Sequence, residues 1–164
     1  MADLLLRPTW RFVLSRPEHL VAFGFGAGLI PVAPGTFGTL LAFPLYWLLI
    51  PHLGTVAFML LVLVLFGLGV WACEMTGHAL GAADHGGMVW DETVAFLLVL
   101  FFVPATLVWQ AWAFLLFRLF DILKPPPIRY YDRKLKSGFG VMFDDLIAAF
   151  YTLLVLAVAK TLLE

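Results

Sequence analysis

The chain has 164 residues, of which 63% are hydrophobic and 13% are charged, and its formal net charge is −1. Soluble domains usually carry about 45–50% apolar and about 25% charged residues, so this composition excludes an ordinary soluble domain and indicates an integral membrane protein. The single cysteine, Cys73, excludes a disulfide framework and a multi-cysteine zinc site. We expect one domain, 1–164, with no nucleic-acid partner.

The N-terminal part of the chain is apolar but irregular. Its first twenty residues are interrupted by Arg7, Arg11 and Arg16 and lack the continuous apolar core of a cleaved signal peptide. The next stretch, 19–38, is rich in glycine and contains two prolines, which make a poor straight helix. A crossing there would also move the three arginines to the far side of the membrane. We therefore predict a re-entrant or interfacial segment, which a bilayer tolerates only where protein shields the backbone.

Five apolar segments follow that could cross a membrane. A spanning helix needs about 20 residues, with a range of about 17–25. By this measure the second and fifth segments are long enough, the first and fourth are marginal, and the third is short. The segments are Phe37–Leu53, Thr55–Cys73, Thr93–Val103, Leu107–Phe120 and Met142–Ala159. We predict an all-α, polytopic helical bundle with about four to five transmembrane helices.

Turn signals and basic residues agree on the topology. Pro51–Gly54 and Pro104–Thr106 separate the first two segments and the next two, which predicts two antiparallel hairpins. Every long polar stretch then returns to the same side of the membrane. All lysines and arginines except Lys160 also fall on that side, which the positive-inside rule makes cytoplasmic. Four polar clusters share this predicted face.

The first polar cluster is the glycine-rich stretch APGTFGT, which contains Gly35, Thr36 and Thr39. Glycine lets backbone N–H groups approach an anion, and either threonine could cap the helix that follows. The stretch is not a Walker A loop, because no Gly-Lys-Ser/Thr sequence closes it. Its alternative interpretation is a tight turn at the membrane.

The second cluster, DHGGMVWDE, places three carboxylates at the mouth of an apolar run. Asp84, Asp91 and Glu92 offer hard oxygen ligands, which suit Mg²⁺ better than zinc. Two glycines between them break a helix, so any proximity of these acids requires the chain to fold back. The alternative, a solvated cap on the next helix, fits one acid better than three. His85 is a candidate ligand, proton carrier or structural hydrogen-bonding group.

The third cluster, FRLFDILKPPPIRYYDRK, alternates acids and cations. Arg118, Asp121 and Lys124 are three residues apart, within one broad helical face, and the triple proline ends that helix before Arg129. Arginine binds phosphate through a two-pronged contact, whereas lysine acts as a point charge. An acid held between cations suits a metal-assisted phosphate site. A polybasic patch for anionic lipid headgroups is the alternative, and it accounts better for the later cations than for Asp121.

The fourth cluster, SGFGVMFDDLIAAF, places Asp144 and Asp145 in the first turns of the last segment. The helix macrodipole favours acids there by about 0.3–1 kcal/mol. Deeper in hydrocarbon, however, a charge costs roughly 2.5–3.5 kcal/mol on insertion scales. We therefore predict that at least one of the two aspartates faces the protein interior.

In this order and at this spacing, the four clusters resemble the phosphatidylglycerophosphatase A family over nearly the whole chain. Pro126, which lengthens the proline run, is the departure from the family pattern. Family members are bacterial inner-membrane enzymes that use Mg²⁺ to remove the terminal phosphate of phosphatidylglycerophosphate, giving phosphatidylglycerol. The positions that match the family are Asp84, Asp91, Glu92, Asp121, Asp144, Asp145, Arg118, Lys124 and Arg129.

The residues and the resemblance together predict metal-assisted hydrolysis of a lipid phosphomonoester at the cytoplasmic face. Predicted ligands of one or two Mg²⁺ ions are Asp84, Asp91, Glu92, Asp144 and Asp145. Predicted catalytic residues are Asp91, Asp121, Arg118, Lys124 and Arg129. Predicted substrate-binding residues are Gly35, Thr36, Lys124 and Arg129. The acyl chains would stay among the bilayer lipids, and either water or a carboxylate of Asp91 or Asp121 would be the nucleophile.

Three alternatives stay open from the sequence. Another lipid phosphomonoester could be the substrate. A phosphotransferase of the CDP-alcohol type would also use aspartates and Mg²⁺ at the membrane face, but its compact Asp-Gly-x₂-Ala-Arg motif is not present. A small transporter would distribute its acids through the depth of the bilayer, whereas these gather on one face. The oligomeric state is open.

Overall fold

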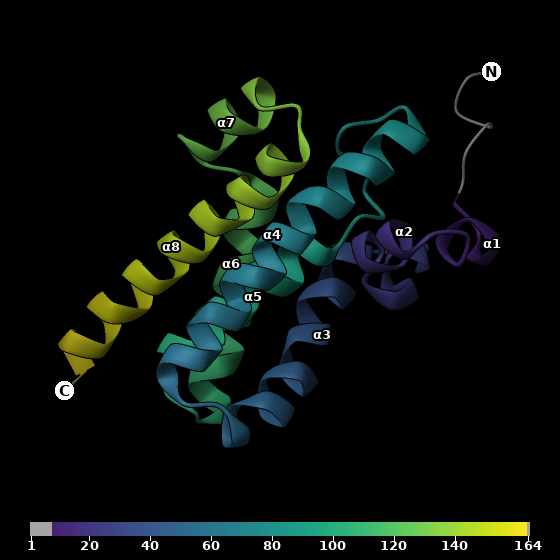
Figure 1. The fold of residues 1–164 in the computed structure, drawn as a ribbon. Coiled ribbons are helices and arrows are strands. Elements are labelled where there is room, and N and C mark those ends of the chain that lie inside the picture. Colours follow the sequence, from purple (N-terminus) through teal and green to yellow (C-terminus); the bar gives the residue numbers. More distant parts are fainter. Residues whose placement is uncertain (1–7, 164) are drawn as a thin grey trace.

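The computed structural model describes residues 8–163, which form helices joined by short loops (Figure 1). No strand occurs among these residues, so the all-α prediction is confirmed. The helices in chain order are α1 Trp10–Val13, α2 Pro17–Ala22, the 3₁₀ helix η1 Gly24–Leu29, α3 Pro34–Leu49, the 3₁₀ helix η2 Ile50–His52, α4 Thr55–Leu80, α5 Trp90–Phe102, α6 Leu107–Leu123, α7 Ile128–Lys134 and α8 Gly138–Leu163.

Helix α5 lies at the centre of the bundle. It packs against α3, α4, α6 and α8. Its aromatic and aliphatic side chains, including Phe96, Leu97 and Leu100, are completely buried. The helix has 13 residues, which at about 1.5 Å per residue is well short of a hydrocarbon core about 30 Å thick. The short third segment is therefore a buried core helix that holds the others together.

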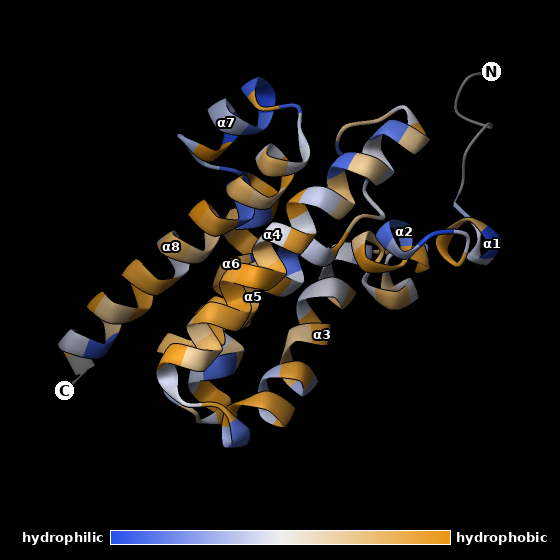
Figure 2. Cartoon of the chain, viewed as in Figure 1, coloured by the Kyte–Doolittle hydropathy of each residue, from blue (hydrophilic) through white to orange (hydrophobic). Residues whose placement is uncertain are grey.

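The outer helices carry the surface expected to contact lipid. Three of them, Pro34–His52, Thr55–Leu80 and Gly138–Leu162, are long and apolar enough to cross a membrane. Large apolar side chains such as Leu63 on α4 and Leu115 on α6 are more than half exposed, and Figure 2 shows these helices as largely hydrophobic. The structure confirms a helical bundle with three candidate membrane-spanning helices, while the predicted number of four to five crossings stays a prediction.

Both predicted hairpins are present (Figure 1). Helix η2 with the residues after it joins α3 to α4, and a turn at 103–106 joins α5 to α6 at the same end of the bundle. The C-terminus of α8 also lies at this end. The start of α5, the end of α6, α7 and the start of α8 therefore gather at the opposite end, where the acids lie.

The predicted re-entrant or interfacial segment, 19–38, is bent rather than straight. Gly24, Phe25 and Gly26 have positive φ angles of 53°, 56° and 104°, which turn the chain inside η1. At Gly28 a Cβ atom would collide with the carbonyl of Gly87, so glycine allows this segment to pack directly on the loop before α5. The backbone N–H of Val89 donates to the carbonyl of Ala22 at 2.8 Å. The segment thus supports the start of α5.

Candidate metal and phosphate site

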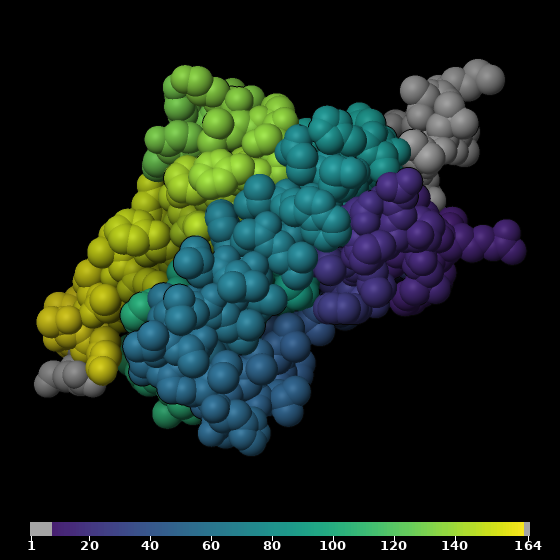
Figure 3. All heavy atoms as spheres, in the orientation of Figure 1, coloured from purple at the N-terminus to yellow at the C-terminus, as the bar shows by residue number. Residues whose placement is uncertain are grey.

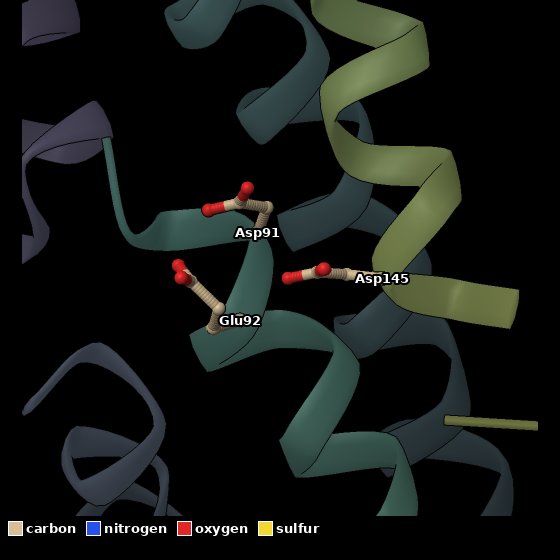
Figure 4. Close-up of side chains that lie close together, drawn as sticks. All are labelled: Asp91, Glu92 and Asp145. Carbon is tan, nitrogen blue, oxygen red and sulfur yellow. The ribbon is translucent and has the colours of Figure 1, made fainter. Parts of the chain in front are cut away.

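Three carboxylates from two helices converge at the polar end of the bundle. Asp91 and Glu92 lie in the first turn of α5, and Asp145 comes from α8 (Figure 4). Each offers an oxygen, and these three oxygens lie within 4.8 Å of one another. Asp91 and Asp145 are buried, and the side chain of Glu92 is only 12% exposed. The cluster thus joins two acids of the second sequence cluster to one of the fourth, whereas Asp84 is not among its members.

The start of α5 is held by contacts on both sides. The indole Nε1 of Trp90 donates to the carbonyl of Leu65 on α4 at 3.2 Å. The hydroxyl of Thr93 donates to the carbonyl of Gly38 on α3 at 2.7 Å. These bonds fix the first turn of α5, which carries Asp91 and Glu92, between α3 and α4.

The start of α8 is fixed against α4. The backbone N–H of Gly138 donates to the carboxylate of Glu74 on α4. A Cβ atom at Gly138 would collide with the carbonyl of Val70, so a larger residue would push the two helices apart. This close approach sets the register that presents Asp145 to α5.

Each carboxylate of the cluster has an oxygen with no partner. Asp91 Oδ1, Glu92 Oε2 and Asp145 Oδ2 are buried and accept no hydrogen bond from the described residues. A buried carboxylate without a compensating charge or donor is strongly unfavourable. Three buried carboxylates, each with an oxygen within 4.8 Å of an oxygen of the others, are a suitable environment for a cation, and carboxylate oxygens favour hard divalent ions.

Arg118 of α6 lies beside this cluster. Its Nη1 donates to Asp121 Oδ2 at 2.5 Å and, more weakly, to Glu92 Oε1 and Thr39 Oγ1 at 3.5 Å. Its Nε is buried and has no acceptor among the described residues. All of its hydrogen bonds to the described residues therefore use Nη1, and a buried donor is left for a ligand with anionic oxygens.

The glycine-rich stretch brings α3 up to this arginine. A Cβ atom at Gly35 would collide with Glu92 Oε1 and would lie 3.1 Å from each Nη atom of Arg118. Gly35 therefore lets Glu92 and Arg118 lie directly against the backbone of α3. The sequence suggested Thr36 or Thr39 as a cap of the following helix, and that prediction is wrong. The helix already begins at Pro34, with Ala33 as an N-cap that makes no side-chain bond.

Thr39 has a role that the sequence reasoning missed. Its buried hydroxyl donates to the carbonyl of Gly35 at 2.9 Å and faces Arg118 Nη1 at 3.5 Å. The spacing of four residues to Gly35 is the signal in the sequence, because a threonine hydroxyl on a helix often bonds the carbonyl one turn earlier. Thr36, in contrast, is only partly buried.

Lys124 forms a second ionic group next to the first. Its Nζ donates to Asp144 Oδ2 at 2.5 Å and to Asp132 Oδ1 at 2.7 Å. Burial disfavours the ammonium, but the two carboxylates outweigh burial and raise the pKa of Lys124. Burial also opposes the charge of Asp132, yet the bond from Lys124 lowers the pKa of that carboxyl. Lys124 therefore links the end of α6 to α7 and α8.

The other predicted site residues lie outside the three-acid cluster. Asp84 is exposed in the loop before α5. Nδ1 of His85 accepts the backbone N–H of Gly87 at 3.0 Å, which is the structural hydrogen-bonding role considered for it. Arg129 is exposed on α7, where its Nη2 donates to the carbonyl of Leu123 at 3.3 Å. Asp144, although adjacent to Asp145, points to Lys124.

Comparisons with known proteins agree with the resemblance seen in the sequence. The family model described as Phosphatidylglycerophosphatase A matches residues 20–160. A Haemophilus influenzae protein named phosphatidylglycerophosphatase A is 48% identical over 90% of this chain and 91% of its own. The Escherichia coli protein of the same name is 41% identical over 84% of this chain and 80% of its own.

A third relative has a different name. A Bacteroides thetaiotaomicron protein named putative phosphatidylinositol-3-phosphatase is 38% identical over 90% of this chain and 98% of its own. No solved structure matches the chain. The match of the family model over most of the sequence, together with relatives aligned over nearly their full length, shows that the chain belongs to the phosphatidylglycerophosphatase A family.

Proposed function

We propose that this chain, as a single domain spanning 1–164, hydrolyses the terminal phosphomonoester of phosphatidylglycerophosphate to phosphatidylglycerol and phosphate with Mg²⁺. The proposal also places it in the bacterial inner membrane with the site facing the cytoplasm, where it would serve phospholipid synthesis. Family membership supports the reaction class. Six of the described cations lie in the last turns of α6, in α7 or in the adjoining loops, all at the polar end of the bundle, which supports the orientation: Arg118, Lys124, Arg129, Arg133, Lys134 and Lys136.

One observation carries this proposal. Asp91, Glu92 and Asp145 each keep a partnerless acceptor, and Arg118, which contacts Glu92, keeps a partnerless donor at Nε. The first set requires a cation and the second requires an anion, and Glu92 Oε1 contacts Arg118 directly. A divalent cation bound to a phosphate group satisfies both sets at once. Neither a purely structural ionic network nor a site for a neutral ligand accounts for both.

The donor set fits Mg²⁺. Asp91, Glu92 and Asp145 would hold the ion, since Mg²⁺ favours a few carboxylate oxygens together with water and substrate phosphate. Bound there, the ion would polarise the phosphoryl group and lower the pKa of a coordinated water. Asp84 and Asp144, which the sequence places with these acids around one or two Mg²⁺ ions, stay predicted ligands.

The chain's own groups would bind and orient the substrate. The free edge of Arg118 would contact oxygens of the phosphoryl group, while Asp121 and Thr39 keep the guanidinium in place. Gly35 would keep Arg118 and Glu92 close to α3, and a substrate contact of Gly35 itself stays a prediction. The acyl chains would stay in the bilayer along the apolar outer helices. Substrate contacts of Thr36, Lys124 and Arg129 stay predictions.

The nucleophile is water in this proposal, with a carboxylate as the variant. Asp121 is bound tightly to Arg118 Nη1, which makes it a weaker nucleophile than an unpaired carboxylate. Asp91, with its free Oδ1, is therefore the stronger candidate for an aspartyl-phosphate intermediate. Rapid acid quenching during turnover of a substrate labelled at its terminal phosphate distinguishes the two, because only the carboxylate route leaves label on the protein.

A second substrate class is favoured by one relative. The Bacteroides thetaiotaomicron protein bears the name of a phosphatidylinositol-3-phosphatase, and the residues around Arg118 would recognise the phosphoryl group rather than the alcohol behind it. A phosphorylated inositol lipid therefore belongs in the substrate panel. The test is phosphate release by the purified chain from phosphatidylglycerophosphate, phosphatidic acid and phosphatidylinositol 3-phosphate, with Mg²⁺ and with EDTA.

We expect Mg²⁺-dependent release that is fastest with phosphatidylglycerophosphate and is abolished by EDTA. Release that persists in EDTA would refute the metal assignment. A preference for the inositol lipid would replace the proposed substrate but retain the site.

A further inference from the structure

Helix α7 is set apart from the membrane-spanning helices. It follows the prolines 125–127, packs on α8, and projects at the polar end of the bundle (Figures 1 and 3). Ile128 is buried, whereas Arg129, Tyr130, Arg133 and Lys134 are exposed. The helix thus has an inner side against the bundle and an outer side that is free.

The acid of α7 is used on the inner side. The sequence of the helix, IRYYDRK, contains three cations and one acid, Asp132. That acid accepts a hydrogen bond from Lys124 Nζ at 2.7 Å. The outer side therefore keeps its cations without an acid from its own helix.

The outer cations line a shared hollow. Pro126, Arg129, Tyr130, Arg133 and Lys134 line an open, shallow hollow of about 500 Å³. Among the ion pairs of residues 8–163, none includes these three cations. Arg129 and Arg133 are also one helical turn apart, a spacing at which like charges destabilise a helix. An anion in the hollow would replace this repulsion with attraction.

The aromatic residue of the hollow indicates where such an anion would come from. Tyr130 is 55% exposed, and its hydroxyl accepts a hydrogen bond from Lys134 Nζ at 2.8 Å, while the ammonium lies 5.1 Å from the ring centre. Exposed tyrosines of membrane proteins concentrate at the level of the lipid headgroups. Arginine forks match phosphate oxygens, and basic residues beside a membrane attract anionic lipid.

We propose that the outer side of α7 binds the phosphodiester headgroup of an anionic phospholipid of the surrounding bilayer, at a site separate from the three-acid cluster. This lipid is a resident ligand and not a substrate. Its binding would hold α7 at the membrane surface, next to the polar end where the proposed substrate enters. The site needs no catalytic activity and does not depend on the proposed reaction.

The test is lipid binding by the full chain in detergent. The probe is phosphatidylserine, an anionic phosphodiester from which a phosphomonoesterase can release nothing, and native mass spectrometry counts the lipids bound. The variant is R133Q/K134Q, which leaves Arg129 intact. We expect the apparent affinity for phosphatidylserine to fall about thirty-fold, because each basic residue near an anionic lipid contributes about a factor of five.

The matched control is R11Q/R16Q, which removes the same charge from two exposed positions on the N-terminal region. It should bind phosphatidylserine as the unaltered chain does. Unchanged binding by R133Q/K134Q, or an equal loss in both variants, would overturn the proposal. Circular dichroism confirms that each variant is folded.

A competition arm separates a lipid from free phosphate. Inorganic phosphate at matched ionic strength should leave phosphatidylserine bound, whereas phosphatidylglycerol should displace it. Displacement by inorganic phosphate would assign the hollow to a soluble anion and overturn the lipid site. Because every readout is lipid binding, a failure here leaves the proposed phosphatase activity untouched, and the reverse also holds.

Discussion

Two neighbouring groups of charged residues each place one cation between two carboxylates, but they differ in how completely their polar atoms are paired. In one, Arg118 lies between Glu92 and Asp121, and in the other Lys124 lies between Asp132 and Asp144. Both contacts of Lys124 are 2.7 Å or shorter. The Arg118 group, in contrast, leaves a buried guanidinium donor and a buried Glu92 oxygen without partners.

The difference separates a structural role from a functional one. A buried charge that is fully paired holds elements in place, and breaking such a pair is costly. A buried charge that is left unpaired in a folded protein calls for an explanation, and a ligand is the simplest one. By this criterion the Lys124 group ties α6, α7 and α8 together, and the Arg118 group with Asp91 and Asp145 is prepared for metal and phosphate.

The largest expected effect is that of D145N. It should lower kcat about 100- to 1,000-fold, because the metal supplies several kcal/mol of transition-state stabilisation and each 1.36 kcal/mol is tenfold in rate. The Tm without metal should stay equal or rise, since an unpaired buried carboxylate is removed. Phosphate release and a thermal scan with and without Mg²⁺ measure both, and the stabilisation by Mg²⁺ should disappear.

The matched variant is D84N, whose acid is exposed outside the cluster. It should retain more activity than D145N and should keep the stabilisation by Mg²⁺. Equal losses in both variants would place Asp84 in the same metal centre and would contradict the three-acid assignment.

R118K should have the second largest effect. Lysine keeps the positive charge but has no fork to offer phosphate oxygens, so we expect kcat/KM to fall about 10- to 100-fold, equivalent to one or two hydrogen bonds to a charged group. The Tm should change little, because an ammonium can still pair with Asp121. Full activity in R118K would mean that the free Nε does not contact the substrate.

K124Q should lower stability more than activity, in contrast to D145N and R118K. It leaves Asp144 buried without its cation. Breaking a fully buried pair lowers the free energy of unfolding by about 3–5 kcal/mol. Because Lys124 is 25% exposed, we expect a smaller loss, about 1–3 kcal/mol. Thermal unfolding in detergent measures this loss. The double variant K124Q/D144N should recover part of the lost stability. If K124Q alone has the Tm of the unaltered chain, Lys124 does not stabilise the packing of α6, α7 and α8.

The smallest expected effect is that of T39V. Valine keeps the shape of threonine but cannot accept the 3.5 Å contact from Arg118, so kcat/KM should fall about three- to tenfold, the equivalent of one modest hydrogen bond. T39S should restore most of the activity. A comparable loss in T39S would show that the methyl group, and not the hydroxyl, positions the arginine.

Much of the fold follows from local patterns. The two hairpin turns were predictable because prolines and glycines mark them. The same signals predicted that α4 begins at Thr55 and α6 at Leu107. The sequence did not show that the third segment is a buried core helix. An apolar run looks the same to a hydropathy pattern whether lipid or protein surrounds it.

The sequence predicted the kind of site, a metal and phosphate site, better than it predicted which residues form it. Acids at the mouth of apolar segments are costly, and that cost predicts that at least one of Asp144 and Asp145 faces the protein interior. It does not single out Asp91, Glu92 and Asp145. Their assembly depends on α5 and α8 packing side by side. Arg129 illustrates the limit, because the prolines 125–127 separate it from the end of α6 and place it on α7.

Asp144 and Asp145 show what the sequence determines and what only the tertiary structure decides. The sequence by itself determined that the last helix carries two acids near its start and that hydrocarbon would not accept both. Successive residues on a helix point about 100° apart, so α8 presents Asp145 to Asp91 and Glu92 and Asp144 to Lys124. Only the packing of α5 on one side of α8 and α6 on the other decided which acid is left without a partner.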